Sequence, residues 1–198
     1  MAGTGAIART VGVIAQEGAP LLHAQGLRGA GGVEGARLGT LSVMAGGAAE
    51  TLARVMPVLE CLAKRITHMG RVGAGQNTKA VNQVLIAGIA QAVCEGLALG
   101  EALGLEPERL LPTLQSGAAA CWFLDKRGAT MLGDEFKVGF KASLLLKDLG
   151  ILEQLAARAG LRASVIPRSL ADYAQLVRLG HGDDDISTLI RLKRPALG

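Results

Sequence analysis

The sequence predicts a mainly helical protein in two parts, an α/β segment over residues 1–70 and an all-helical segment over residues 71–198. Strand-like runs alternate with helical ones up to Met69 and then stop. One helical pattern continues from Gln76 to about Leu103, which corresponds to roughly 42 Å at the usual rise per residue. With one Trp, one Tyr and three Phe, the core must be built from small aliphatic side chains, and these suit close helix packing.

The first part contains short elements in α/β order. The expected elements are a helix at 6–15, a buried strand at 20–24, an alternating strand at 40–44, a helix at 48–61 and a strand at 65–69. The helix at 48–61 carries apolar residues on one face, namely Leu52, Val55, Met56 and Leu59. A glycine-rich stretch at 26–47 surrounds the alternating strand.

The second part continues with further helices after the long one. They are expected at 107–115, 119–132, 141–159, 166–179 and 185–192, the last with Asp185 as its N-cap. The long helix is apolar on nearly all sides, so we expect it to be buried on most of them. Gly88, Gly96 and Gly100 would let another helix approach it closely. A single chain covers such a helix poorly, and we therefore expect a homodimer or tetramer.

Composition excludes several other classes of protein. Hydrophobic residues make up 49% and charged residues 19%, which is a globular balance. The net charge of +4 is scattered, and the basic run at 191–194 is expected to be a solvated tail, so no nucleic-acid partner is predicted. Three widely spaced cysteines without a CxxC predict no metal site and no disulfide framework, but reduced thiols in the cytoplasm. The apolar run at 84–93 is too short to span a membrane, and the first residues make a poor signal peptide.

One candidate site is the start of the long helix. The segment Gly73-Ala-Gly-Gln-Asn-Thr-Lys-Ala-Val-Asn-Gln83 leads from a glycine turn into this helix. Lys79, Asn82 and Gln83 are spaced i, i+3, i+4 and so share one helix face, where a cation and two amides can meet a small polar substrate. By itself, the same pattern also fits an ordinary solvated helix start.

Three further segments complete the pattern. The first is the glycine turn Gly31-Gly-Val-Glu-Gly-Ala36, followed by Gly39 to Gly47. The second runs from Trp122 through Arg127-Gly-Ala-Thr-Met131 to Phe140 and Lys147-Asp-Leu149, and the third is Gly180-His-Gly-Asp-Asp-Asp-Ile-Ser187. Lys147 alone could be a surface lysine. The lysine motif and the Lys-Asp-Leu motif in this order are a specific pair. Over about residues 31–193 the chain resembles the β-hydroxyacid dehydrogenases of the 3-hydroxyisobutyrate dehydrogenase and tartronate semialdehyde reductase type.

The resemblance implies a fold and an activity. Residues 1–70 would be the remnant of a Rossmann-like NAD(P)-binding domain, and residues 71–198 would resemble the C-terminal domain of 6-phosphogluconate dehydrogenase. The reaction would be hydride transfer between NAD or NADP and a small 3-hydroxy acid or its semialdehyde, with Lys79 as proton donor and acceptor. The implied substrate-binding residues are Ala30, Gly31, Gly32, Asn82 and Gln83. The implied cofactor-binding residues are Phe140, Lys147 and Asp148.

The sequence departs from the family pattern at three places, of which the one at Gln83 is minor. The family's Gly-x-Gly-x-x-Gly turn has only Gly3-Thr-Gly-Ala-Ile-Ala8 as a match, with no strand before it. Residues 4–24 instead resemble the last helix and strand before the substrate loop, so we expect a truncated cofactor domain that binds dinucleotide weakly. Ala30 stands where the family usually has Ser. The alternative to an active dehydrogenase is an impaired relative that acts as a helical dimerisation module.

Overall fold

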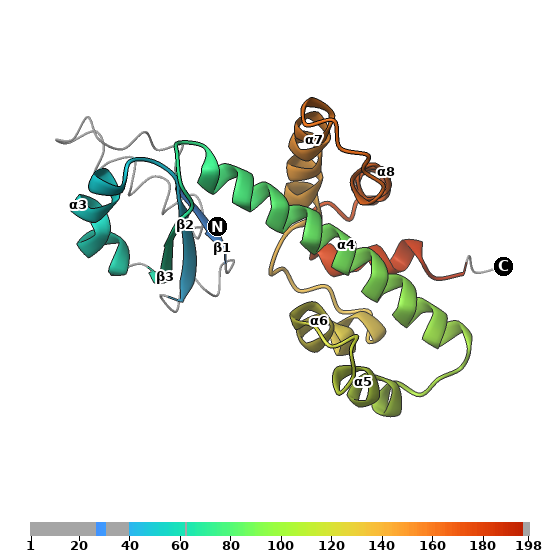
Figure 1. Cartoon of the computed structure of the whole chain (residues 1–198). Coiled ribbons are helices and arrows are strands. Elements are labelled where there is room, and N and C mark those ends of the chain that lie inside the picture. Colours follow the sequence, from blue (N-terminus) through green and yellow to red (C-terminus); the bar gives the residue numbers. More distant parts are fainter. Residues whose placement is uncertain (1–26, 31–39, 62, 196–198) are drawn as a thin grey trace. The chain divides into compact units, whose positions relative to one another are not determined.

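The computed structural model describes residues 27–30, 40–61 and 63–195 (Figure 1). The chain divides into two compact units, residues 1–82 and 83–198, and helix α4 (Ala74–Ala102) runs through the boundary. Within the described ranges, no strand follows Gly75, and the predicted mainly helical fold is confirmed. The domain bounds at residues 70 and 71 stay a prediction.

The first unit holds a three-stranded sheet. Its strands are β1 (Leu27–Ala30), β2 (Leu41–Ala45) and β3 (Ala63–His68), in the order β1-β2-β3. β1 runs antiparallel to β2, whereas β2 and β3 are parallel and are connected through helix α3 (Ala49–Glu60). β1 was not predicted. The predicted helix at 6–15 and strand at 20–24 lie outside the described residues.

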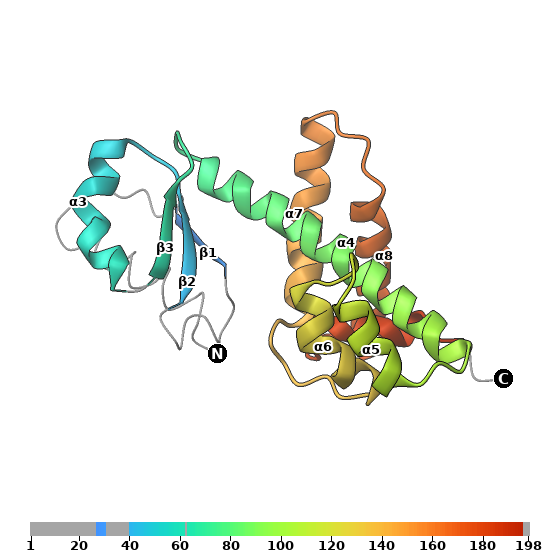
Figure 2. The ribbon, with the colours of Figure 1, turned by 60° about the horizontal axis from the view of Figure 1, so that its bottom comes forward.

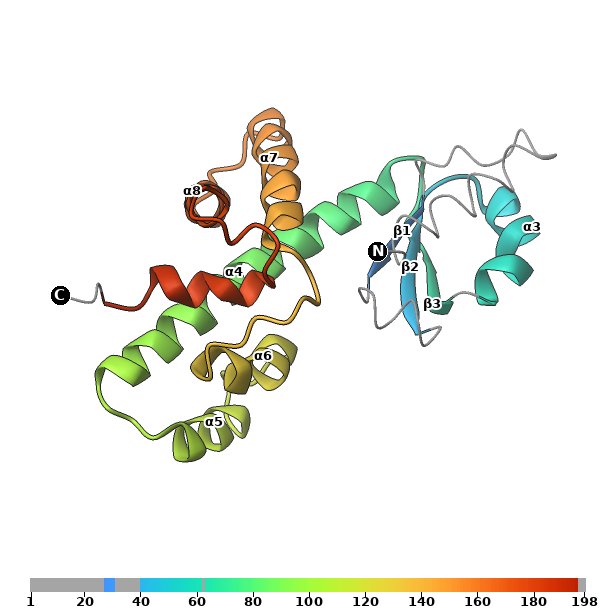
Figure 3. The ribbon, with the colours of Figure 1, turned by 180° about the vertical axis from the view of Figure 1, so that it is seen from behind.

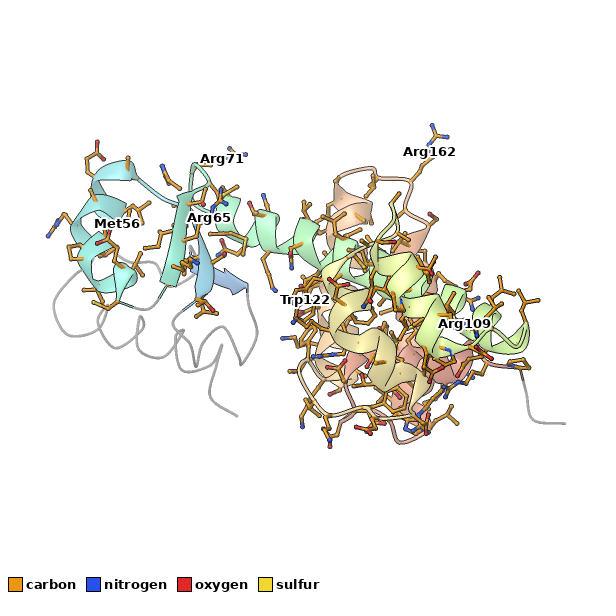
Figure 4. The ribbon with its side chains drawn as sticks, turned by 90° about the horizontal axis from the view of Figure 1, so that it is seen from below. Met56, Arg65, Arg71, Arg109, Trp122 and Arg162 are labelled. Carbon is orange, nitrogen blue, oxygen red and sulfur yellow. The ribbon has the colours of Figure 1, made fainter. Side chains whose placement is uncertain are left out.

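The core of the first unit is aliphatic. β2 alternates as predicted, with Leu41, Val43 and Ala45 buried. Leu52 and Leu59 of α3 pack with Ala45, and the half-buried Val55, Met56 and Ile66 surround them. The predicted apolar face of α3 therefore covers one face of the sheet, and Figure 4 marks Met56 on α3 and Arg65 on β3.

The end of β2 packs closely on the beginning of α4. The N–H of Gly47 donates to the carbonyl of Gly70 over 2.8 Å. A Cβ atom added to Gly46 would stand 2.8 Å from the carbonyl oxygen of Arg71 and 3.1 Å from the nitrogen of Ala74. Backbone meets backbone at this point, so only glycine fits at position 46.

Helix α4 has one buried face and one exposed face. Its buried face is formed by Gln83, Ala87, Ala90, Cys94 and Leu97. The opposite face carries the exposed residues Leu85, Ile89, Ala92, Gly96 and Leu99, and the exposed Leu103 follows directly after the helix; we call these six residues the α4 stripe. The expectation that α4 is buried on most sides is therefore wrong for the single chain. The helix is apolar on both faces, but one face is buried within the unit and the other is exposed.

The remaining elements of the second unit are helical. They are α5 (Pro107–Gln115), α6 (Trp122–Leu132), α7 (Ala142–Arg158), α8 (Val165–Arg178) and the 3₁₀ helix η1 (Ile186–Leu192). α5 packs beside α6 and α7 packs beside α8 (Figure 2), while η1 contacts α6, α7 and α8. Figure 3 shows these helices from behind. The predicted helices agree with these bounds to within three residues. Asp185 is the N-cap of η1 as predicted, and its side chain accepts from the N–H of Ser187.

The two residues after η1, which we call the C-terminal strap (Lys193 and Arg194), are tied into the helical unit. Asp172 of α8 accepts from Lys193 Nζ over 2.7 Å and from Gln91 Nε2 over 3.0 Å. Arg194 binds both carboxylate oxygens of Glu101 over 2.8 and 2.9 Å. The expectation of a solvated basic tail is wrong here, since only 6% of the Lys193 side chain is exposed.

The charges around Asp172 explain its ionisation. Burial alone would raise the pKa of Asp172. Hydrogen bonds from Lys193 and Gln91, together with the charges of Lys193 and Arg168, outweigh burial and hold the pKa below its usual value. Asp172 is therefore ionised at neutral pH, and the pair with Lys193 is a buried ion pair.

Candidate active site

The lysine motif occupies the first turns of α4. Gly73 has φ +93°, a left-handed conformation that favours glycine, and its carbonyl accepts from the N–H of Asn77. Lys79 and Asn82 are half-buried, and Gln83 is 2% exposed. The i, i+4 spacing brings the side chains of Lys79 and Gln83 together on one face of the helix.

The structure brings the two motifs of the predicted pair into contact. Nε2 of Gln83 donates to Oδ2 of Asp148 on α7 over 2.8 Å. The other oxygen of Asp148 lies 3.3 Å from Nζ of its exposed neighbour Lys147. Because Gln83 is buried, water competes little with this bond, and the bond fixes which side of the amide faces α7. The contact joins residues that are 65 positions apart in the chain.

Phe140 lies just before α7 and its backbone is held on both sides. Its N–H donates to the carboxylate of Asp185 over 3.0 Å, and its carbonyl accepts from the N–H of Ile186 over 2.9 Å. The ring is half-buried. Sequence reasoning identified Asp185 only as a helix cap and missed its bonds to this segment, because the donors come from distant parts of the chain.

The structure describes only the approach to the glycine turn. Gly31 and Gly32 lie outside the described residues. Ala30 is the last residue of β1 and pairs with Ser42 of β2. From the roles that the resemblance implies, we predict that Lys79, Lys147 and the glycine turn face one cleft, and this arrangement stays a prediction.

Other titratable groups in the helical unit are poor candidates for chemistry. Burial raises the pKa of the Cys94 thiol to about 12, so Cys94 is no nucleophile at neutral pH. Burial also raises the pKa of Tyr173 well above its usual value, and the Tyr173 hydroxyl donates to the carbonyl of Ile186. Within the described ranges, no group of three or more His, Cys, Asp or Glu residues could hold a metal ion.

Two sequence models of protein families match the chain. The NAD-binding domain of NADP-dependent 3-hydroxyisobutyrate dehydrogenase matches residues 73–193, which include both motifs. The NAD-binding domain of 6-phosphogluconate dehydrogenase matches residues 15–70. Together the two matches account for most of the chain.

Individual relatives agree with the family models. An uncharacterised oxidoreductase of Synechocystis is 37% identical over 92% of this chain and 64% of that relative. The 2-hydroxy-3-oxopropionate reductase of Escherichia coli is 40% identical over 64% of this chain and 43% of the relative. A crystal structure of the Mycobacterium tuberculosis 3-hydroxyisobutyrate dehydrogenase with L-serine has a TM-score of 0.77 and 33% identity, over 85% of this chain and 60% of that one. The chain spans about three-fifths of the length of the first curated relatives.

Proposed function

The chain belongs to the β-hydroxyacid dehydrogenase family, and on this premise we propose that it takes part in hydride transfer between NAD or NADP and a small 3-hydroxy acid or its semialdehyde. Lys79 is the proposed proton donor and acceptor. The observation that carries the proposal is the bond between Gln83 and Asp148, because it joins the lysine motif to the motif assigned to the cofactor.

The proposed chemistry divides the work between the residues of α4. A nicotinamide, when bound, would supply the hydride chemistry, and in the oxidation the unprotonated amine of Lys79 would accept the proton of the substrate hydroxyl. In the reverse reaction, the protonated amine would return this proton. Asn82 and Gln83 orient the reacting oxygen, since their amides lie on the same helix face as Lys79. An unperturbed lysine is protonated at neutral pH, which suits proton donation to a semialdehyde.

The residues proposed for the cofactor begin at the start of α7. Phe140 offers a half-buried ring on a fixed backbone, and Lys147 offers an exposed cation two helical turns further on. The carboxylate of Asp148 already has protein partners, since one oxygen accepts from Gln83 and the other forms an ion pair with Lys147. We infer that Asp148 acts on the cofactor side mainly by fixing these two neighbours.

The sheet unit supports the proposal at the level of fold. β2, α3 and β3 form one parallel strand pair with a crossover helix, the repeating unit of Rossmann-like domains. We infer that residues 40–70 are the last such unit of a Rossmann-like domain. The proposed glycine turn at Gly31 and Gly32 precedes this unit, and its backbone amides would hold the substrate carboxylate.

Replacing Lys79 by alanine tests the reaction directly. We expect the rate of hydroxy-acid oxidation, followed by nicotinamide absorbance, to fall about 10²- to 10⁴-fold because the proton has no acceptor. Lys64→Ala is the matched control, since Lys64 is an exposed lysine on β3. Equal rates for the two variants would contradict the role of Lys79, and an inactive parent chain would contradict the proposed reaction.

The α4 stripe supports a second proposal, a homo-oligomer built on the helical unit. A shallow groove of about 410 Å³ overlaps the stripe and is lined by Gly88, Gln91, Ala92, Glu95, Gly96, Leu99 and Val165. By length and composition alone, α4 could also cross a membrane, although core helices of soluble proteins pass the same criterion. The exposed Glu95 in mid-helix favours a protein partner over lipid. The size and apolar character of the stripe fit a second copy.

A charge placed on the stripe tests this assembly. Leu99→Glu should convert the oligomer to a monomer in light scattering at micromolar concentration, because the interface would bury an unpaired charge. Leu161→Glu is the control, since both leucines are 59% exposed and Leu161 lies outside α4. A parent chain that is monomeric would overturn the proposal. A stable dimer without turnover would instead favour the dimerisation module as the function of the chain.

A further inference from the structure

The carboxylate of Asp185 collects donors from three separate segments. Oδ1 accepts from Arg127 Nε over 3.1 Å, from the Ser187 N–H over 3.1 Å and from the Ser187 hydroxyl over 2.8 Å. Oδ2 accepts from the N–H groups of Gly139 and Phe140 over 2.8 and 3.0 Å. Asp185 is 1% exposed. We call these five residues the Asp185 cluster. Capping η1 needs only the bond to the Ser187 N–H, so the other donors require a different explanation.

The cluster fixes the approach to α7. A Cβ atom on Gly139 would collide with Nη2 of Arg127, so the guanidinium packs against this stretch of backbone. Nζ of Lys141 donates to Asp183 over 2.6 Å, and the N–H groups of Ala142 and Ser143 donate to the carbonyls of Asp184 and Gly182 over 2.9 Å each. The segment 139–143 is therefore held at successive residues by the segment 182–185 and by α6.

We propose that Asp185 is a positioning residue for the cofactor end of the site, which it serves by holding the backbone of Phe140 in place. The inference rests on the proposed function, because Phe140 is the residue assigned to the cofactor. Asp185 itself reaches the site only through Phe140. Arg127 assists by neutralising the buried carboxylate and by closing the space beside Gly139.

The role requires a carboxylate rather than an amide. Both oxygens of Asp185 are used, one toward Arg127 and Ser187 and the other toward Gly139 and Phe140. Asparagine has the same shape but only one acceptor oxygen, and its NH₂ group would face N–H donors. Asp185→Asn should therefore release one side of the cluster while preserving the volume of the side chain.

The test compares Asp185→Asn with Asp172→Asn. Asp172 is also a buried aspartate with several donors, but it holds the C-terminal strap and not the approach to α7. In Asp185→Asn we expect amide hydrogen exchange at Gly139 and Phe140 to accelerate about tenfold or more, because these N–H groups lose their acceptor. In Asp172→Asn both amides should keep their protection.

Kinetics and fluorescence separate positioning from a general loss of structure. Asp185→Asn should raise the KM for the nicotinamide cofactor about tenfold or more and leave the KM for the hydroxy acid near its parent value. The guanidinium of Arg127 lies 5.6 Å from the ring centroid of Trp122, the single tryptophan, which is exposed at the start of α6 (Figure 4). Because Arg127 loses an acceptor in Asp185→Asn, the fluorescence of Trp122 should change in that variant and stay constant in Asp172→Asn.

The outcomes distinguish the inference from the proposed function. Unchanged exchange at Gly139 and Phe140 would overturn the holding role of Asp185, whatever the activity. Faster exchange with an unchanged cofactor KM would overturn the link to the cofactor. A parent chain that turns over no hydroxy acid would overturn the proposed function and the cofactor link together, while the exchange data would still decide whether Asp185 holds the segment.

Discussion

Each of the two units of the chain is stabilised internally by a different kind of interaction. Both buried charged residues within the described ranges, Asp172 and Asp185, belong to the helical unit, where each accepts hydrogen bonds from several elements. The described part of the sheet unit instead relies on aliphatic contacts around Leu41 and Leu59 and on a close backbone approach at Gly46.

The difference has a consequence for what each unit tolerates. Aliphatic contacts are non-directional, so a sheet core accepts other side chains of similar volume. A buried carboxylate fixes the direction of each donor, and the loss of one partner leaves an uncompensated charge. We therefore expect the helical unit to be sensitive to isosteric changes of polarity and the sheet unit to be sensitive to changes of volume.

The largest effect is expected from removing the acid that holds the C-terminal strap. Asp172→Ala leaves Lys193 buried without its partner, and we expect the unfolding free energy of the helical unit to fall by about 3–5 kcal/mol. Denaturant unfolding followed by circular dichroism measures this loss. Since whole domains are stable by only about 5–15 kcal/mol, the variant should be close to unfolding.

A double substitution checks the cause of that loss. Replacing Asp172 by asparagine together with Lys193 by methionine removes both charges and nearly keeps the volume of both side chains, so much of the stability should return. A cost of less than about 1 kcal/mol for Asp172→Ala would be in the range of an exposed ion pair. It would contradict the conclusion that buried ionic contacts stabilise the helical unit.

A smaller loss is expected in the sheet unit from Gly46→Ala. The new Cβ atom would meet the carbonyl of Arg71 and the first N–H groups of α4, and these backbone atoms cannot rotate away as a side chain can. We expect a cost of about 1–3 kcal/mol, the range for overpacked sites. Hydrogen exchange should show it as faster exchange at Met69, whose N–H donates to the carbonyl of Ala45 next to the turn. Unchanged protection at Met69 would show that the turn has room.

The helices of the second unit could be predicted from local signals. Pro107 at the start of α5 and the Asp185 cap of η1 mark helix ends within a few residues of sequence. β1 escaped prediction because Leu27–Ala30 has no alternation and lies in a glycine-rich stretch. The exposed face of α4 could not be predicted either, because the helix carries apolar residues on all sides.

The candidate site was predictable only in part for a related reason. The motifs identified Gln83 and Asp148 separately, and nothing local indicates that they bond to each other. The Asp185 cluster is even harder to predict from sequence, because its donors at Arg127, Gly139 and Phe140 lie 45 to 58 positions away from Asp185. Contacts of this kind depend on the packing of α6, α7 and η1, which no periodicity in the sequence encodes.

The smallest effect is expected from glycines inside helices of the second unit, and it separates packing from helix propensity. Gly150 lies within α7, and a Cβ atom there would meet nothing within 4 Å, whereas a Cβ atom on Gly128 in α6 would stand 2.8 Å from Cδ2 of Leu111. Alanine loses less backbone entropy than glycine on folding, so Gly150→Ala should stabilise the helical unit by about 0.5–1 kcal/mol. Gly128→Ala brings the same entropic gain but must displace Leu111, so its net change should be lower and can be a loss. Thermal unfolding of the two variants side by side measures the difference. A larger gain for Gly128→Ala than for Gly150→Ala would mean that α5 and α6 pack more loosely than the aliphatic contact at Leu111 indicates.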